Sequence, residues 1–155
     1  MENNENKIKW SDFIDKKQQR SKLFEVAFTH PSYKGYNPHV ETNKILELIG
    51  DKVLDLILYH FLFLRYEHTI SKKDMDDARQ ELMSKQGLKI IFDIFNLEKY
   101  LIKPPNHFLE LSPGVKHNIV EALIGAIYLE EGFEIVFKFV TELIDKGYFV
   151  DSSED

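Results

Sequence analysis

Two carboxylates interrupt the most apolar stretch of the chain. Glu47 and Asp51 stand four positions apart within the segment 44–63, which is otherwise rich in leucine and isoleucine. If this segment is helical, the spacing places both carboxylates on one face of the helix. Burying a carboxylate costs several kcal/mol unless it is paired or bound to a metal ion, so an acid pair at this place needs a physical reason.

A second polar pair stands at the start of another apolar run. Asn118 and Glu121 are three positions apart and lead into a run that ends at Ile127. Oxygen ligands of this kind hold hard divalent cations such as Mg²⁺, which can activate water and clamp a phosphodiester for hydrolysis. The alternative is that Glu47 and Asp51 form an ordinary acidic pair on a partly exposed face, and their spacing alone does not decide between the two.

The elements that position these pairs are expected to be helices. Apolar residues recur at helical spacing along most of the chain, and few segments show the alternation of apolar and polar residues that is typical of strands. Helices are predicted as two short elements within 10–28, then over 44–63, from Ser71 onward, and over 84–95, 115–131 and 133–147. The segment 102–114 is predicted to be a loop because it contains three prolines and a glycine.

The sequence therefore predicts a single all-α domain. The segment 44–63 is apolar nearly all the way round, so we expect that helix to be buried in the middle of the domain. Gly50 lies between Glu47 and Asp51, where a small residue would permit the close approach of another element. We expect residues 10–148 to form the domain, residues 1–9 to be a disordered N-terminus and residues 149–155 to be an acidic tail.

Composition excludes several classes of site. The chain of 155 residues has no cysteine, which rules out a disulfide scaffold, a thiol nucleophile and a thiolate metal site. None of its six histidines is three or four positions from another, so a histidine zinc site is not indicated. The net charge of −6 argues against a protein that binds nucleic acid through bulk positive charge alone. The same net charge is compatible with a carboxylate site that recruits cations.

No targeting signal is recognised at the start of the sequence. Residues 1–6 are polar and acidic, and the stretch 53–64 is too short and too often interrupted to span a bilayer. We expect an intracellular protein, in cytoplasm or nucleus, that has no membrane partner.

Three blocks of the sequence resemble the ribonuclease III family. The stretch 45–54, ILELIGDKVL, is similar to the signature motif of that family, and 27–33, AFTHPSY, resembles its Thr-His-x-Ser-Tyr motif. Downstream, 120–129, VEALIGAIYL, is similar to its third characteristic block. The blocks occur in the family's order, and the resemblance extends over roughly residues 20–146.

The resemblance implies an all-helical, metal-dependent endonuclease that cleaves double-stranded RNA as a homodimer. Its cofactor would be Mg²⁺, with Mn²⁺ as a second option, and water would be the nucleophile. The family's catalytic and metal-binding positions correspond to Glu47, Asp51, Asn118 and Glu121, and a family dimer contact corresponds to Leu48. No segment after residue 150 could form the separate RNA-binding domain of many members, so the protein either works without that domain or is a fragment.

Several departures from the family pattern lower the negative charge of the predicted site. Asn118 stands where the family has an acid, and Lys44 stands where an acid is often found. His117 is bulkier than the usual small residue, and Leu48 replaces an aromatic residue. These departures leave an alternative function open, a catalytically degenerate ribonuclease III-like module for dimerisation or RNA scaffolding.

Overall fold

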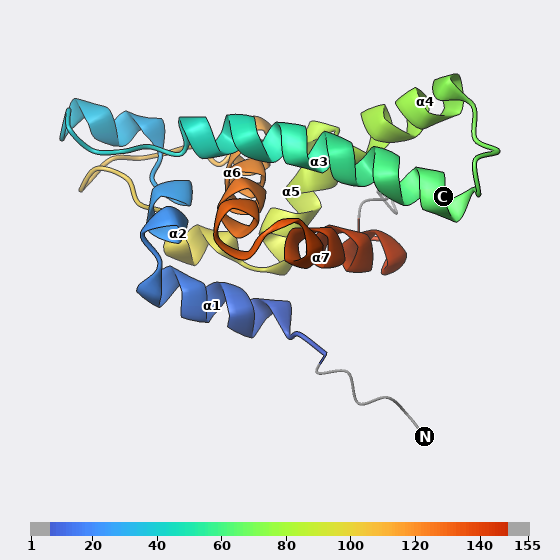
Figure 1. The fold of residues 1–155 in the computed structure, drawn as a ribbon. Helices are drawn as coiled ribbons and strands as arrows, with labels where there is room; N and C mark the ends of the chain where they lie inside the picture. The colour runs from blue at the N-terminus through green and yellow to red at the C-terminus, as the bar shows by residue number, and fades with distance from the viewer. Residues whose placement is uncertain (1–6, 149–155) are drawn as a thin grey trace.

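The regular elements of the protein are all helical. The computed structural model describes residues 7–148, except for the side chain of Lys85. In chain order the α-helices are α1 (Trp10–Arg20), α2 (Lys22–Ala27), α3 (Lys44–Arg65), α4 (Lys72–Leu82), α5 (Lys85–Ile94), α6 (Pro113–Glu131) and α7 (Phe133–Asp145). Two short 3₁₀ helices, η1 (Pro31–Gly35) and η2 (Leu97–Tyr100), complete the set shown in Figure 1. The predicted all-α class is confirmed.

Serine side chains mark where four of the helices begin. Ser21 separates α1 from α2 and accepts a hydrogen bond from the backbone N–H of Phe24. Ser71 caps α4 at the predicted start, Ser84 caps α5 and Ser112 caps α6, each through the N–H three residues ahead. A side-chain oxygen at this position satisfies one of the backbone donors that a helix leaves free at its N-terminus.

The predicted loop 102–114 is two residues too long. Pro113 and Gly114 are the first residues of α6, not the end of the loop. Proline is tolerated at this place because the first N–H groups of a helix have no partner within the helix. Of the predicted disordered N-terminus, residues 1–9, only residues 7–9 are among the described residues. The predicted acidic tail, residues 149–155, lies wholly outside them.

The central helix is α6, not the segment 44–63 as predicted. Every residue of α6 from Ile119 to Ile127 is buried, and α2, α3, α5 and α7 all pack against this helix. Small residues such as Ala122 and Ala126 let neighbours approach α6 from several sides. The predicted central helix, α3, lies across α6 and leaves an apolar stripe exposed: Ile45, Leu48, Leu56 and Phe63. None of the described helices is long and apolar enough to cross a membrane.

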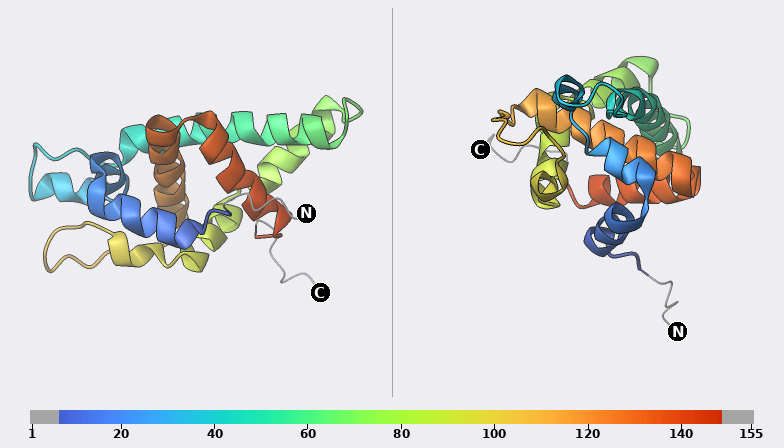
Figure 2. Two further views of the ribbon diagram at one scale, coloured as in Figure 1. Left: turned by 60° about the horizontal axis from the view of Figure 1, so that its bottom comes forward. Right: turned by 90° about the vertical axis from the view of Figure 1, so that its left-hand side faces the viewer.

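The two helices that carry the polar pairs meet at a pair of glycines. A Cβ atom built on Gly50 would lie 1.7 Å from the carbonyl oxygen of Glu121, and one on Gly125 would lie 2.3 Å from that of Leu46. Figure 2 shows that α6 runs across α3 rather than along it. The close approach predicted at Gly50 is therefore confirmed, and it brings the residues around Glu47 and Asp51 next to those around Glu121.

We predict that Gly50→Ala destabilises the fold by about 3 kcal/mol, because the new methyl group would meet backbone atoms that cannot move aside. Urea unfolding followed by circular dichroism measures the change. Gly35→Ala is the matched control, since a Cβ atom there would have no neighbour within 4 Å. Equal midpoints for the two variants would contradict a tight contact between α3 and α6.

Candidate metal centre between α3 and α6

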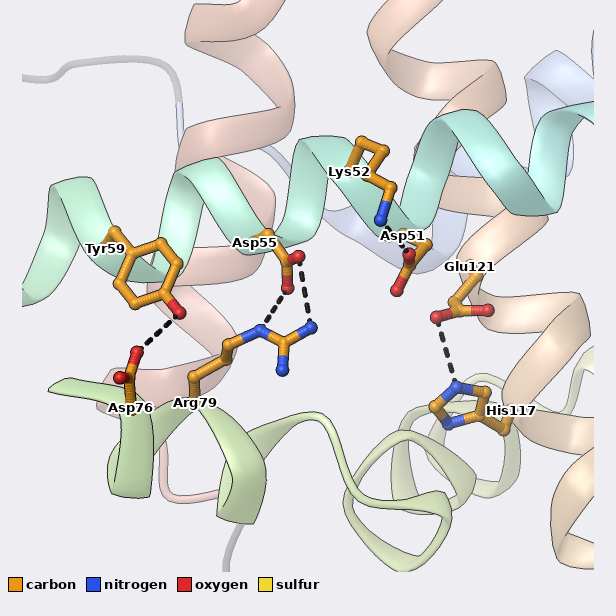
Figure 3. A network of polar contacts seen from close by, with 8 residues as sticks. All are labelled: Asp51, Lys52, Asp55, Tyr59, Asp76, Arg79, His117 and Glu121. Atoms are coloured by element: carbon orange, nitrogen blue, oxygen red, sulfur yellow. Dashed lines mark hydrogen bonds and ion pairs between the residues drawn. The ribbon is translucent and has the colours of Figure 1, made fainter. Parts of the chain in front are cut away.

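Asp51 and Glu121 face the same space from two different helices. Figure 3 shows the carboxylate of Asp51 on α3 and that of Glu121 on α6, with His117 one turn before Glu121. Glu121 is 5% exposed as a whole residue and is the only charged residue buried within the described part of the chain, whereas the side chain of Asp51 is 30% exposed. The site is therefore open on the side of α3 and closed on the side of α6.

Glu47 and Asn118 line a small cavity beside this pair. The cavity has a volume of about 90 Å³, and its walls also include His30, Asn43 and Lys44. Asn43 is 2% exposed, and its side-chain oxygen has no hydrogen-bond partner in the structure. An unpartnered buried oxygen is costly unless a water molecule or a cation meets it. The four predicted site residues thus lie in one region, as a facing pair and a cavity-lining pair.

His117 is the residue of this region whose contact the sequence reasoning missed. Its Nε2 atom lies 3.1 Å from Oε1 of Glu121, and its side chain is 15% exposed. The two residues are four positions apart on α6, so the signal was present in the sequence as an i,i+4 pair of a potential cation and an anion. The Nδ1 atom of His117 is buried and has no hydrogen-bond partner of good geometry. The backbone of Ser84 nevertheless lies close to the ring and helps to raise the pKa of His117.

Burial and neighbouring charges set the ionisation of the site. Burial raises the pKa of Glu121, and the hydrogen bond and charge of His117 offset part of that rise. Burial acts to lower the pKa of His117, but Glu121, the backbone of Ser84 and the charge of Asp51 together outweigh it, so the pKa of His117 is raised. Burial also raises the pKa of Glu47 against the opposing charges of Lys44 and His117. Each of these carboxylates therefore gains from a nearby cation, because a positive charge favours its ionised form.

Cations of the chain itself lie beside two of the carboxylates. Nζ of Lys52 is 3.2 Å from Oδ2 of Asp51, and His117 pairs with Glu121 as described.

Within residues 7–148, no three histidine, aspartate or glutamate side chains are gathered closely enough to hold a metal ion. The donor set is nevertheless rich in oxygen, with three carboxylates, the Asn118 amide and the unpartnered oxygen of Asn43. That chemistry fits a hard divalent cation.

Two neighbouring residues have structural contacts instead. Asp55, one turn beyond Asp51, makes a two-point ion pair with Arg79 of α4, at 2.6 Å and 3.1 Å. His30 accepts a hydrogen bond from the backbone N–H of Ser32 and also contacts its hydroxyl at 2.7 Å, which fixes the turn into η1. These contacts join α3 to α4 and hold one wall of the cavity.

Comparison with known proteins identifies the family. A family model described as ribonuclease-III-like matches residues 20–147. The chain belongs to this family. It is 32% identical over 150 residues to Ribonuclease 3 of Leptospira interrogans, an alignment that covers 94% of this chain and 60% of the relative. It is 34% identical over 127 residues to Ribonuclease 3 of Clostridium acetobutylicum, and that alignment covers 79% of this chain and 54% of the relative. The chain thus spans about 60% of the length of curated family members.

Solved structures of a family nuclease domain have the same fold. The nuclease domain of ribonuclease III from Campylobacter jejuni superposes with a TM-score of 0.74 at 27% identity, and the match covers 94% of this chain and all of that domain. A second structure of that domain gives a TM-score of 0.75 at 28% identity and is described for structural flexibility in the region involved in dimer formation. The resemblance of the three sequence blocks to the ribonuclease III family is confirmed.

The contact between His117 and Glu121 yields a prediction for the metal-free protein. Replacing Glu121 by Gln removes the negative charge that raises the pKa of His117 and leaves burial, which lowers it, against the smaller raising effects of Ser84 and Asp51. We therefore expect the pKa of His117 to fall in this variant.

Titration of the imidazole C–H resonances by NMR measures this pKa, with the exposed His39 as internal reference. An unchanged titration of His117 would contradict the pairing.

Proposed function

We propose that this chain is the nuclease domain of an endoribonuclease that cleaves double-stranded RNA with Mg²⁺. The observation that carries the proposal is the buried Glu121 facing Asp51 where α3 and α6 cross. The family membership supports a ribonuclease, and the oxygen-rich donor set supports a hard divalent cation. The alternative of an ordinary acidic pair concerns Glu47 and Asp51, which are both half-buried, and it gives no reason for the burial of Glu121.

In this proposal the residues of the site have separate tasks. Glu121 and Asp51 hold the ion directly, and Glu47 binds it directly or through water. Asn118 contributes a neutral oxygen at most. A bound divalent ion lowers the pKa of water and offsets charge on the phosphodiester. Because burial disfavours the charged forms of Glu47 and Glu121, both carboxylates are stabilised as anions when a cation is present.

We also propose that the protein acts as a homodimer through α3. The exposed stripe includes Ile45 and Leu48, which are 68% and 57% exposed. An apolar cavity of about 650 Å³ lies beside it, with Ile45, Ile49 and Leu129 among its lining residues. A protruding side chain next to a hollow is self-complementary under two-fold symmetry, because each copy can then fill the hollow of the other. Exposed apolar surface of this extent is typical of an interaction site.

Double-stranded RNA is the substrate that suits such a pair of sites. Two-fold symmetry would give a dimer two equivalent acidic centres, one for each strand of a duplex. The net charge of −6 disfavours binding through bulk charge, so recognition would depend on bound cations and on the shape of the A-form helix.

The cleavage prediction concerns Glu121, because it is the most deeply buried of the acids. We expect the full chain to cut labelled duplex RNA with Mg²⁺ or Mn²⁺ and not with a chelator. Glu121→Gln should lower the cleavage rate by more than roughly 100-fold. Replacing a residue that only hydrogen-bonds to a metal ligand already lowers activity by up to about 100-fold, and we propose that Glu121 is itself a ligand. The matched control is Glu134→Gln, at an exposed position of α7. Wild-type cleavage by Glu121→Gln would refute the assignment.

The dimer prediction concerns Leu48. We expect Leu48→Lys to weaken self-association about tenfold or more, which equals about 1.4 kcal/mol, because it places a charge in an apolar contact. Analytical ultracentrifugation of the full chain measures the dissociation constant. Ile94→Lys is the control, at an exposed apolar position on α5. A wild-type chain that stays monomeric at micromolar concentration, or equal effects of the two substitutions, would count against α3 as the interface.

A further inference from the structure

His117 offers the candidate metal centre a nitrogen donor that the ribonuclease III resemblance does not assign. Its Nε2 atom lies 3.1 Å from Oε1 of Glu121, and both side chains project from the same face of α6. Both are largely enclosed, with exposed fractions of 15% for His117 and 6% for Glu121. The pair therefore presents a nitrogen and an oxygen side by side at the space that Asp51 faces from α3.

The spacing of the two atoms suits a shared ion. The two donor atoms lie 3.1 Å apart, which is close enough for both to reach one cation. Residues four apart on a helix are a known chelating arrangement, since they share one face.

We propose that His117 is a ligand of the metal bound by Glu121, and that it shifts the preference of the site from Mg²⁺ toward Mn²⁺. This inference rests on the proposed metal centre and adds the residue that sets its selectivity. Mg²⁺ takes oxygen ligands, whereas imidazole nitrogen binds transition-metal ions more readily. A nitrogen donor at this place therefore favours Mn²⁺ over Mg²⁺, and the ion would replace the proton that Nε2 carries when His117 pairs with Glu121.

The depleted charge of the centre makes a neutral donor more important. Lys44 lines the cavity beside Glu47, Lys52 pairs with Asp51, and Asn118 brings no charge. This surrounding weakens the binding of both divalent ions, because both depend on negative oxygen ligands. The His117 imidazole offsets more of that loss for Mn²⁺ than for Mg²⁺.

The test uses the full chain with Mn²⁺ alone as the probe, and it reads coordination rather than activity. Pulsed electron paramagnetic resonance of bound Mn²⁺ should show coupling to an imidazole nitrogen, and His117→Gln should abolish that coupling. His117→Gln should also weaken Mn²⁺ binding about tenfold or more, while Mg²⁺ binding, measured by competition, should change less than about twofold. His39→Ala, at an exposed loop position, is the control for adventitious histidine binding.

The possible failures are distinguishable. Bound Mn²⁺ without nitrogen coupling, while Glu121→Gln still abolishes binding, would overturn the role of His117 and leave the proposed centre intact. Failure of the wild-type chain to bind Mn²⁺, or full binding by Glu121→Gln, would overturn both. The nitrogen signal of the wild-type chain decides the matter even if His117→Gln does not fold.

Discussion

The backbones of α3 and α6 approach each other at Gly50 and Gly125 more closely than any side chain would permit. This contact fixes where the two helices cross, and the crossing decides which residues of α3 face which residues of α6. Asp51 follows Gly50 directly, and Glu121 stands one turn before Gly125, so both carboxylates are held beside the crossing. A larger residue at either glycine would push the helices apart and separate the two acids.

The burial of Glu121 sets the electrostatic requirement of the site. A carboxylate inside a helical core is stabilised only by a partner, and the metal-free protein supplies His117 for this purpose. Asp51 pairs with Lys52 in the same way at the more exposed side. Each pairing places a basic group of the chain beside a carboxylate. A divalent ion would therefore compete with the Lys52 ammonium group at Asp51 and with the proton of His117 at Glu121.

The residue patterns were sufficient to predict the helical class and the order of the helices, and the ribonuclease III resemblance implied that the two polar pairs belong to one site. Spacing on a helix is local, so Glu47 with Asp51 and Asn118 with Glu121 could be assigned to common faces in advance. The centre of the fold could not be predicted in this way. The segment 44–63 is apolar nearly all round, yet α6 is the buried helix, because an apolar face that stays exposed on the chain looks the same in sequence as one buried in the core. The i,i+4 spacing of His117 and Glu121 indicates a possible contact, but spacing alone does not show that the fold encloses both side chains.

The proposed metal centre lies where α3 and α6 cross. Anomalous scattering from a crystal of the full chain soaked in Mn²⁺ tests its position most directly. We expect a peak in contact with the carboxylates of Glu121 and Asp51. A well-occupied peak elsewhere, for example at the exposed acids of α4, with none between α3 and α6, would contradict it.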